Sequence, residues 1–304
     1  MKFIKDFKEI SKKDIFVAGG KGASLGELVK IRVPVPEGFV VTTEAYRQFL
    51  KENELKIDLK GVDTEDSEAV SFVSDELQKL ILDGKVNSTL QEEIILHFNQ
   101  LNCQFVAVRS SATAEDATRT SWAGQLSTYL NTQKKDLIDN VKRCWASLFN
   151  PRAISYRATQ GLLEADIAVA VIVQKMIDAE VSGIVFTAHP VTKDPDMILI
   201  EAGFGLGEAM VSGMVTPDNY VVNKKDLTIY DFKISKQKKM VTKEGTLDVP
   251  EEKQGERKLP EKKAIELAKL CIKIEDHYKI PQDIEWALTK NKLYILQSRA
   301  ITTL

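Results

Sequence analysis

Apolar residues recur at steps of three and four over residues 43–102, which is the spacing of an amphipathic helix. The clearest run is Val70, Val73, Leu77, Leu80 and Ile81. We therefore expect residues 43–102 to form a helical scaffold. Ahead of it, AGGKGASLGEL predicts a glycine-rich turn that opens a helix near Ser24, and PVPEGFVV predicts a turn followed by a strand.

Short strands and one helix follow the scaffold. QFVAVR predicts a strand that runs into the polar loop SSATAED, and SWAGQLSTYLN predicts a glycine turn followed by a strand. The next helix has one apolar face and ends in a break at Asn150 and Pro151. That face consists of Leu137, Val141, Cys144, Trp145 and Leu148.

The rest of the chain is rich in strands. IAVAVIVQKMI, SGIVFTAHP and DMILIEAG predict buried strands, and NYVVNKKDLTIYDFKI predicts a hairpin. KLPEKKAIELAKLCIKIEDHY predicts a long amphipathic helix capped by Pro260, and DIEWALTKNKLYILQSRAI predicts a final hairpin. This order indicates an α+β protein with mixed sheets, whose least ordered stretch is expected at residues 243–258.

Composition narrows the class of protein. The chain has 304 residues, 43% of them hydrophobic and 28% charged, which excludes a disordered protein. Its 42 Lys and Arg against 44 Asp and Glu leave a net charge of −2, which disfavours nucleic acid as the main partner. The Lys-rich residues 224–243 alternate with apolar positions, so a solvated strand surface is the favoured interpretation.

Location and redox state follow from simple patterns. The apolar stretch that begins at Ile167 stops at Gln174 and Lys175, too short to cross a membrane, and the N-terminus lacks a signal-peptide core. We expect a cytoplasmic protein. Its three cysteines have no paired spacing, so we interpret them as reduced core residues. They are Cys103, Cys144 and Cys271.

The last hairpin brings polar groups together. If Asn291 is the middle of an odd-numbered loop, Leu293 faces Thr289. The same count pairs Gln297 with Glu285 and Arg299 with Asp283, and puts Trp286, Leu288, Tyr294 and Leu296 on the opposite, apolar face. Oxygen ligands beside an arginine suit Mg²⁺. The alternative is a solvent-facing edge hairpin with an Asp–Arg salt bridge, and an even-numbered loop would flip the register.

Other segments could contact phosphate, each weakly by itself. GGKG is not a Walker motif, because Gly22 follows the lysine, yet Lys21 could still place one charge beside backbone donors. Arg109 could hold a phosphate bidentately, or it could be an ordinary surface residue. GFGLGEA departs from the dinucleotide spacing and could be a flexible turn. The histidines lie in no triad context, which disfavours hydrolysis through a nucleophilic triad.

Taken together, these segments resemble the N-terminal ATP-binding domain shared by phosphoenolpyruvate synthase, pyruvate phosphate dikinase and rifampicin phosphotransferase. The matching motifs occur in the family's order and cover essentially the whole chain. They are GGKGASLGEL, VPVPEGFVVT, VAVRSSATAEDA, SWAGQ, SGIVFTAHPVT, EAGFGLGEAMVSGMVTPDNY, and DIEWA with LQSRAIT. The resemblance implies an ATP-grasp fold, in which two lobes with mixed or antiparallel sheets enclose a nucleotide cleft. The lobes would be residues 1–177 and 178–304.

The resemblance also implies roles for individual residues, with ATP and Mg²⁺ as cofactors. Lys21, Arg109 and Arg299 would be the catalytic cations on the phosphates, and Glu285 and Gln297 the Mg²⁺ ligands. The remaining nucleotide contacts would be a loop over the phosphates (Ser121, Gly124, Gln125), a hinge at adenine (Gln174, Lys175, Met176) and a ribose or base contact (Glu208).

Full enzymes of this kind continue into a phosphohistidine domain and an acceptor-substrate domain, and we expect neither in these 304 residues. None of His97, His189 and His277 stands in the family's phosphohistidine motif. The expected function is therefore the MgATP-binding module of a dikinase-like phosphotransferase, which acts on a histidine in cis or in trans. No nucleic acid or membrane partner is expected.

Two other functions stay open at this stage. The chain could be the ATP-binding domain of a rifampicin phosphotransferase-like enzyme, since the acceptor is chosen outside it. It could also be a regulatory ATP sensor, although the set Lys21, Arg109, Glu285, Gln297 and Arg299 favours phosphoryl transfer, because a sensor needs no transfer apparatus.

Overall fold

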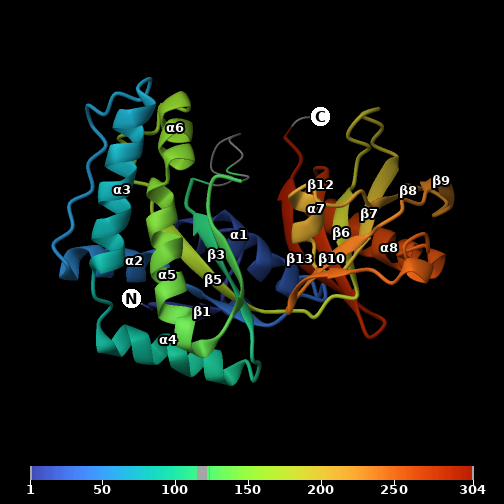
Figure 1. Ribbon diagram of the computed structural model, residues 1–304, viewed down its shortest axis with the longest axis horizontal. Helices are drawn as coiled ribbons and strands as arrows, with labels where there is room; N and C mark the ends of the chain where they lie inside the picture. The colour runs from blue at the N-terminus through green and yellow to red at the C-terminus, as the bar shows by residue number, and fades with distance from the viewer. Residues whose placement is uncertain (1, 115–121, 123, 303–304) are drawn as a thin grey trace. The chain divides into compact units, whose positions relative to one another are not determined.

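The chain forms two compact units (Figure 1). The computed structural model describes residues 2–114, 122 and 124–302. Unit 1 comprises Met1–Lys30 and Glu37–Met176, and unit 2 comprises Ile31–Pro36 and Ile177–Leu304. The chain therefore leaves unit 1 for six residues, Ile31–Pro36, and returns before it finally enters unit 2.

Unit 1 is built on a five-stranded sheet with the strand order β1-β2-β5-β3-β4, in which every neighbouring pair is antiparallel. The central strand is buried over most of its length because its sequence, VAVIVQK, is apolar on both faces. The strands are β1 (Ile4–Asp6), β2 (Gly38–Val41), β3 (Val106–Ala112), β4 (Thr128–Thr132) and β5 (Val169–Lys175).

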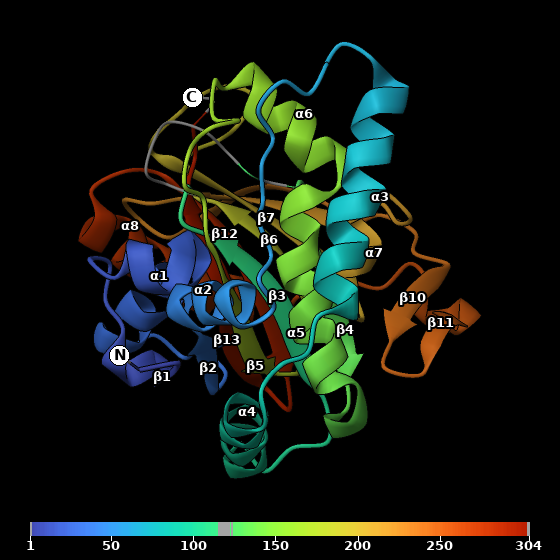
Figure 2. The same ribbon diagram turned by 90° about the vertical axis from the view of Figure 1, so that its left-hand side faces the viewer.

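Helices cover both faces of this sheet. On one face Phe39, Val108 and Val173 join a single core with Trp145. Trp145 belongs to α5, which lies alongside β3 and β5 (Figure 2). On the other face α1 contacts β3 and β5. The helices of unit 1 are α1 (Ile15–Lys30), α2 (Thr43–Glu52), α3 (Ser67–Asp83), α4 (Ser88–Gln100), α5 (Leu137–Ala146) and α6 (Pro151–Thr159), with 3₁₀ turns η1 (Phe7–Glu9), η2 (Lys134–Asp136) and η3 (Ser147–Phe149).

Helix α1 corrects one sequence prediction. It begins at Ile15, well before the expected start near Ser24, and a kink at Gly19 (φ 68°) interrupts it. A residue with a side chain is strained at that φ, and a Cβ atom there would overlap the Ser111 carbonyl group. Lys21 consequently lies in the first turn after the kink.

Unit 2 contains a six-stranded antiparallel sheet with the order β13-β12-β6-β7-β8-β9 and a separate hairpin, β10-β11. Its strands are β6 (Val181–Phe186), β7 (Met197–Phe204), β8 (Asp218–Asn223), β9 (Ile229–Lys233), β10 (Lys239–Thr242), β11 (Gly245–Asp248), β12 (Gln282–Thr289) and β13 (Lys292–Ala300). Its helices are α7 (Glu208–Val211), η4 (Glu251–Lys253) and α8 (Glu261–Tyr278).

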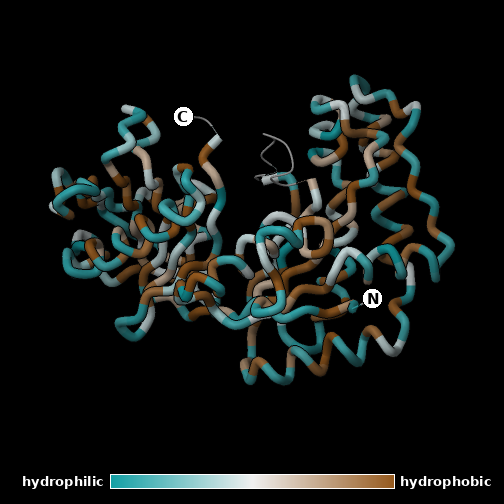
Figure 3. Tube along the Cα trace, turned by 180° about the vertical axis from the view of Figure 1, so that it is seen from behind, coloured by the Kyte–Doolittle hydropathy of each residue, from teal (hydrophilic) through white to brown (hydrophobic). Residues whose placement is uncertain are grey.

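The period-two alternation of the strands divides the sheet of unit 2 into an apolar and a polar face. Trp286, Ile200 and Val222 are fully buried on one face, beside α8, which contacts β7, β8 and β12. Figure 3 shows hydrophobic stretches in the interior of each unit. The opposite face carries Glu285 and Glu201, so unit 2 has one core-forming face and one face with polar side chains.

Residues 243–258, expected to be the least ordered stretch, contain regular elements. They include β11 and η4, and they end at a lysine whose side chain is fully buried. Lys258 Nζ forms an ion pair with Asp218 Oδ1 at 2.8 Å and also donates to the Ser235 carbonyl oxygen. This internal salt bridge ties the segment to the start of β8.

Two further expectations can be compared with the fold. Cys144 and Cys271 are buried free thiols, whereas Cys103 is only half-buried and so is not a full core residue. Within the described part of the chain, none of the helices combines the length and apolar character needed to span a bilayer.

Candidate functional site

Lys21 is held against β3 by the geometry of the Gly19 kink. The Ser111 hydroxyl group accepts from the Gly22 backbone N–H at 3.1 Å and donates to the Ala18 carbonyl oxygen at 2.9 Å. Lys21 Nζ donates to the Ser110 carbonyl oxygen at 3.2 Å. One buried serine therefore holds the two sides of the Gly19 kink, and the lysine charge lies beside the strand that carries Arg109.

Arg109 and Gln174 lie on the same sheet face as this turn. Arg109 pairs with Ile172, and Gln174 pairs with Ala107, so all four side chains share the face covered by α1. Arg109 is 8% exposed and Gln174 is 2% exposed. Gln174 Nε2 has no hydrogen-bond partner among the described residues. A buried, unpaired amide donor is costly unless an acceptor from outside the chain completes it.

The other two hinge residues are placed differently. Lys175 pairs with Val106, so its side chain is directed to the opposite face from Gln174. The backbone N–H groups of Lys175 and Met176 donate to the carbonyl oxygens of Glu37 at 2.9 Å and Phe105 at 3.1 Å. These two backbone N–H groups are therefore already paired within unit 1.

The SWAGQ segment is anchored at both ends of its described part. Trp122 is 2% exposed and packs edge-on against Tyr156, with ring centroids 5.1 Å apart. Gln125 donates its backbone N–H to Trp122 at 3.1 Å and accepts from Asn150 Nδ2 at 2.7 Å. Gly124 has φ 70° and open space where a Cβ would be. Ser121, also expected here, lies outside the described residues.

In unit 2, Gln297 faces Glu285 and Arg299 faces Asp283, as predicted, although the loop is even-numbered. Lys290 and Asn291 form a two-residue turn with φ 46° and 62°, so Thr289 pairs with Lys292 and not with Leu293. A β-bulge at Leu296 then shifts the register by one residue and restores the functional pairs. The odd-loop count was therefore wrong for the turn.

The bulge also changes the apolar face. Trp286 and Leu288 lie there as predicted, but their partners are Ile295 and Leu293, which are buried. Tyr294 pairs with Ala287 instead, on the opposite face. The assignment of Tyr294 and Leu296 to the buried face was wrong. It assumed that the register of the Glu285–Gln297 pair continues unchanged to the turn, whereas the bulge shifts it by one residue.

Charges on the polar face influence one another. Arg299 Nε and Nη2 donate to Asp283 Oδ2 at 2.9 and 2.6 Å. Burial nevertheless raises the pKa of Asp283, against the lowering effect of Arg299, and Glu285 raises it further. Burial, and then Asp283, raise the pKa of Glu201. These carboxylates form an electronegative surface, and a bound cation would reduce the repulsion between their charges.

Glu208 is exposed at the first position of α7, a short helix that packs on the same face of the sheet as Glu285. Ala287 pairs with Ser182, and Ser182 pairs with Gly203, so Gly203 is on the same face of the sheet as Glu285. A Cβ atom added to Gly203 would lie 3.0 Å from Met210 Sδ, which places α7 over this face. Unit 2 thus presents Glu285, Gln297 and Arg299 on one face, and α7, which carries Glu208, packs over that face.

The donor set for a metal is small. In the part of the chain that the structure describes, no group of three or more His, Cys, Asp and Glu side chains could hold a metal ion. Glu285 and Gln297 lie opposite each other on neighbouring strands, which supplies one carboxylate and one amide oxygen. Such a sparse oxygen set fits Mg²⁺, which completes its octahedron with water and phosphate oxygens.

Sequence reasoning missed the residues that orient this site. Ser111 was treated only as part of a polar loop, and Glu201 was not singled out. Glu201 could have been found by extending the period-two count of the hairpin to DMILIEAG, but the order of the strands was needed to choose its neighbours.

Comparison with known proteins identifies the class. A family model described as the pyruvate phosphate dikinase AMP/ATP-binding domain matches residues 15–304, and the chain belongs to this family. The suspected family is thereby confirmed, and the α+β architecture agrees with it.

Individual relatives are similar over the whole chain. The chain is 44% identical to a protein of Methanocaldococcus jannaschii described as "Probable phosphoenolpyruvate synthase", covering 100% of this chain and 27% of that protein. It is 42% identical to phosphoenolpyruvate synthase of Pyrococcus furiosus (100% and 44%) and 40% identical to rifampicin phosphotransferase of Bacillus subtilis (97% and 35%). The chain therefore spans less than half of these curated relatives.

A solved structure of D-alanine-D-alanine ligase from Helicobacter pylori is a distant match, with a TM-score of 0.33 and 12% identity over 76% of this chain and 53% of that one. This likeness is too low to assign the fold by itself.

Proposed function

We propose that this chain is the MgATP-binding module of a dikinase-like phosphotransferase of the phosphoenolpyruvate synthase type. The module would deliver a phosphoryl or pyrophosphoryl group from ATP to a histidine on another domain or chain. Membership of the AMP/ATP-binding family supports the nucleotide. The observation that carries most weight is the common face of unit 1 that holds Lys21, Arg109 and the unpartnered amide of Gln174.

Each group has a chemical task in this proposal. Lys21 and Arg109 bind phosphate oxygens, and the backbone of Ser121, Gly124 and Gln125 covers them. Gln174, Lys175 and Met176 contact adenine, and Glu208 contacts the ribose or the base. Arg299 leaves Asp283 to stabilise charge on the transferred group, because its side chain is 38% exposed and can reorient.

Mg²⁺ would be held by Glu285 and Gln297 and would neutralise charge on the phosphates. Phosphoryl transfer needs positioning and charge neutralisation more than covalent catalysis by the protein. The residues proposed here supply both, and they leave the nucleophile to another polypeptide segment.

A rifampicin phosphotransferase-like enzyme is the second candidate, favoured by the 40% identity to the Bacillus subtilis protein. The ATP-binding chemistry would be the same. The two candidates differ in the final acceptor, which an assay with pyruvate and rifampicin on the protein that contains this chain would distinguish.

MgATP is expected to stabilise the folded chain. At about 100 times the dissociation constant, one-site binding adds roughly 2.7 kcal/mol to the free energy of unfolding and raises the melting temperature. Glu285→Ala and Gln297→Ala should both weaken Mg²⁺-dependent binding. Glu285→Ala, at a half-buried position, should change metal-free stability by less than about 1 kcal/mol. Glu244→Ala, in the exposed β10–β11 turn, is the matched control. An unchanged melting temperature of folded protein in millimolar MgATP would contradict the proposal.

Labelled MgATP is expected to leave no acid-labile phosphohistidine on the 304-residue chain alone. His97 lies in α4, with its Nδ1 2.9 Å from the Glu93 carbonyl oxygen, and His189 Nδ1 accepts from Val191 and Thr192 backbone N–H groups. His277 lies in α8. A separate polypeptide bearing a phosphohistidine domain should become labelled, and Arg299→Ala should abolish that labelling. Stoichiometric label lost on replacing one of the chain's own histidines would refute this division of labour.

A further inference from the structure

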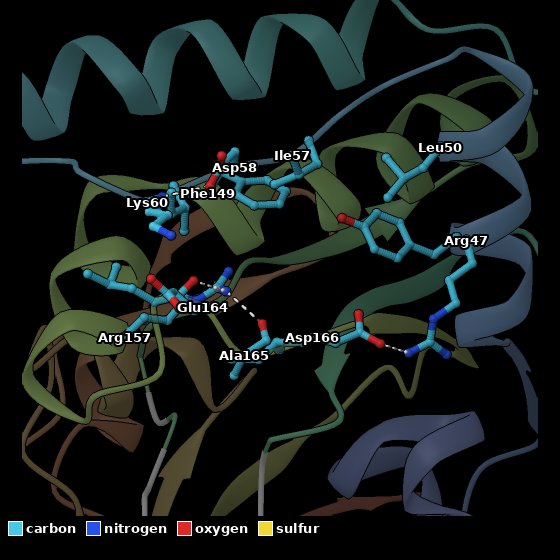
Figure 4. Close-up of a pocket in the computed structure, with 14 residues that line it drawn as sticks. Arg47, Leu50, Ile57, Asp58, Lys60, Phe149, Arg157, Glu164, Ala165 and Asp166 are labelled. Atoms are coloured by element: carbon cyan, nitrogen blue, oxygen red, sulfur yellow. Dashed lines mark hydrogen bonds and ion pairs between the residues drawn. The ribbon is translucent and has the colours of Figure 1, made fainter.

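Unit 1 contains a cavity away from the residues assigned to the nucleotide. Its volume is about 470 Å³, and its walls come from α2, the 57–60 segment, η3, the end of α6 and the loop before β5 (Figure 4). Leu59 and Phe149 form buried parts of the wall, and Leu50 and Ile57 form half-buried parts. This volume lies within the range of small-molecule sites.

Arg157 brings a buried charge into this wall. It is 4% exposed, at the end of α6. Nε donates to the Leu162 carbonyl oxygen at 3.2 Å, and Nη2 donates to those of Leu163 and Ala165 at 3.0 Å. Figure 4 shows Arg157 beside Glu164 and Ala165. Three bonds to carbonyl groups hold the guanidinium in place but do not neutralise it.

No described carboxylate forms an ion pair with Arg157, and no described group accepts from its Nη1. Burial accordingly lowers the pKa of this guanidinium from its ordinary value. A guanidinium has five N–H donors, and Nη1 carries two of them. Since Arg157 lines the cavity, these two donors and the uncompensated charge are available to an occupant that brings a planar, acidic group.

The rim of the cavity limits the charge of such an occupant. Asp58, Glu164 and Asp166 are exposed there, and Asp166 is paired with Arg47 at 3.0 Å (Figure 4). Lys60 is the other rim cation. Three carboxylates around one entrance disfavour a dianion such as phosphate, while a monocarboxylate can still reach the buried guanidinium. The apolar part of the wall, formed by Leu50, Ile57, Leu59 and Phe149, can contact a hydrocarbon body behind that group.

We propose that this cavity is a binding site for a small monocarboxylate with an apolar or aromatic body, whose carboxylate is held by Arg157. The inference does not rest on the proposed phosphotransferase function, because none of the cavity residues is assigned to nucleotide or metal. Hydrocinnamate is a suitable probe, and hydrocinnamamide is its uncharged counterpart of nearly the same shape.

Titration of the full chain, followed by protein NMR shifts, tests the site. Hydrocinnamate should bind saturably, with a dissociation constant on the order of 0.1–1 mM, and shift the resonances of residues around the cavity. Hydrocinnamamide should bind roughly tenfold more weakly or worse, because it lacks the charge that Arg157 would complete. Inorganic phosphate should not displace the carboxylate.

Two variants separate the cavity from the fold. Ile57→Trp fills the cavity and leaves Arg157 intact, so it should weaken hydrocinnamate binding roughly tenfold or more. Ile280→Trp makes the same change at a 47% exposed position outside the cavity and should leave binding unchanged. Both variants should still bind MgATP. Arg157→Met, in folded protein, should make the carboxylate and the amide bind equally.

Several results would overturn the proposal. These are no saturable binding of hydrocinnamate up to about 10 mM, equal binding of the two probes by the unmodified chain, displacement by phosphate, or unchanged binding in Ile57→Trp.

Discussion

Lys258→Met is expected to lower the free energy of unfolding of unit 2 by about 3–5 kcal/mol, because it leaves the Asp218 carboxylate buried without its cation. Both side chains are 0% exposed, and their charged atoms are 2.8 Å apart. Asp218 would retain the backbone N–H groups of Ser235 and Lys258, each at 2.9 Å, but these donors do not neutralise its charge. Urea unfolding monitored by Trp286 fluorescence, with Trp122 and Trp145 replaced by Phe, measures the effect.

Lys225→Met is the matched control. Lys225 Nζ lies 2.6 Å from Asp196 Oδ2, but the two side chains are 74% and 48% exposed. Losing this pair should cost less than about 1 kcal/mol. Equal losses in the two variants would show that burial does not govern the effect. The double variant Asp218→Asn with Lys258→Met should recover part of the loss, because neither charge is then left buried.

Trp286→Ala is expected to cost about 3–5 kcal/mol by opening a large cavity in the core of unit 2. The indole is fully buried, and its Nε1 has no hydrogen-bond partner among the described residues. Trp286→Phe should therefore lose much less, since it keeps most of the packing and removes an unpaired donor. Denaturant unfolding followed by circular dichroism compares the two.

Glu285→Ala provides the internal contrast, because Glu285 adjoins Trp286 in the same strand and lies on the polar face. Its stability should change by less than about 1 kcal/mol. If Glu285→Ala unfolded the unit and Trp286→Ala did not, the assignment of the two faces would be reversed.

The hairpin shows how far sequence reasoning extends. Period-two alternation was enough to pair Glu285 with Gln297, because the observed hairpin and the hairpin assumed from an odd-numbered loop have the same register at this pair. The count could not reveal the two-residue turn and the bulge at Leu296, whose one-residue offsets cancel. The apolar partners lie between the turn and the bulge, and only there did the count fail.

Long-range contacts explain the other differences. The sequence around Lys258 does not indicate burial, because the residue follows a charged stretch. Its burial depends on Asp218, at the start of β8. The early start of α1 also depends on a distant residue. At the Gly19 kink, the Ser111 hydroxyl group from β3 pairs with the Ala18 carbonyl oxygen and the Gly22 N–H. Buried strands were easier to predict, because continuous apolar runs carry their own signal.

The segment Ile31–Pro36 affects how unit 2 could be produced as a separate fragment. β13 is an edge strand, and the Pro34 carbonyl oxygen accepts from its Ile295 N–H at 2.8 Å. An open reading frame that starts at Ile177 would encode the six-stranded sheet but leave this edge uncovered, which favours association with other strands. A usable expression boundary would have to supply the six residues from elsewhere, for example by joining them through a linker to one end of the fragment.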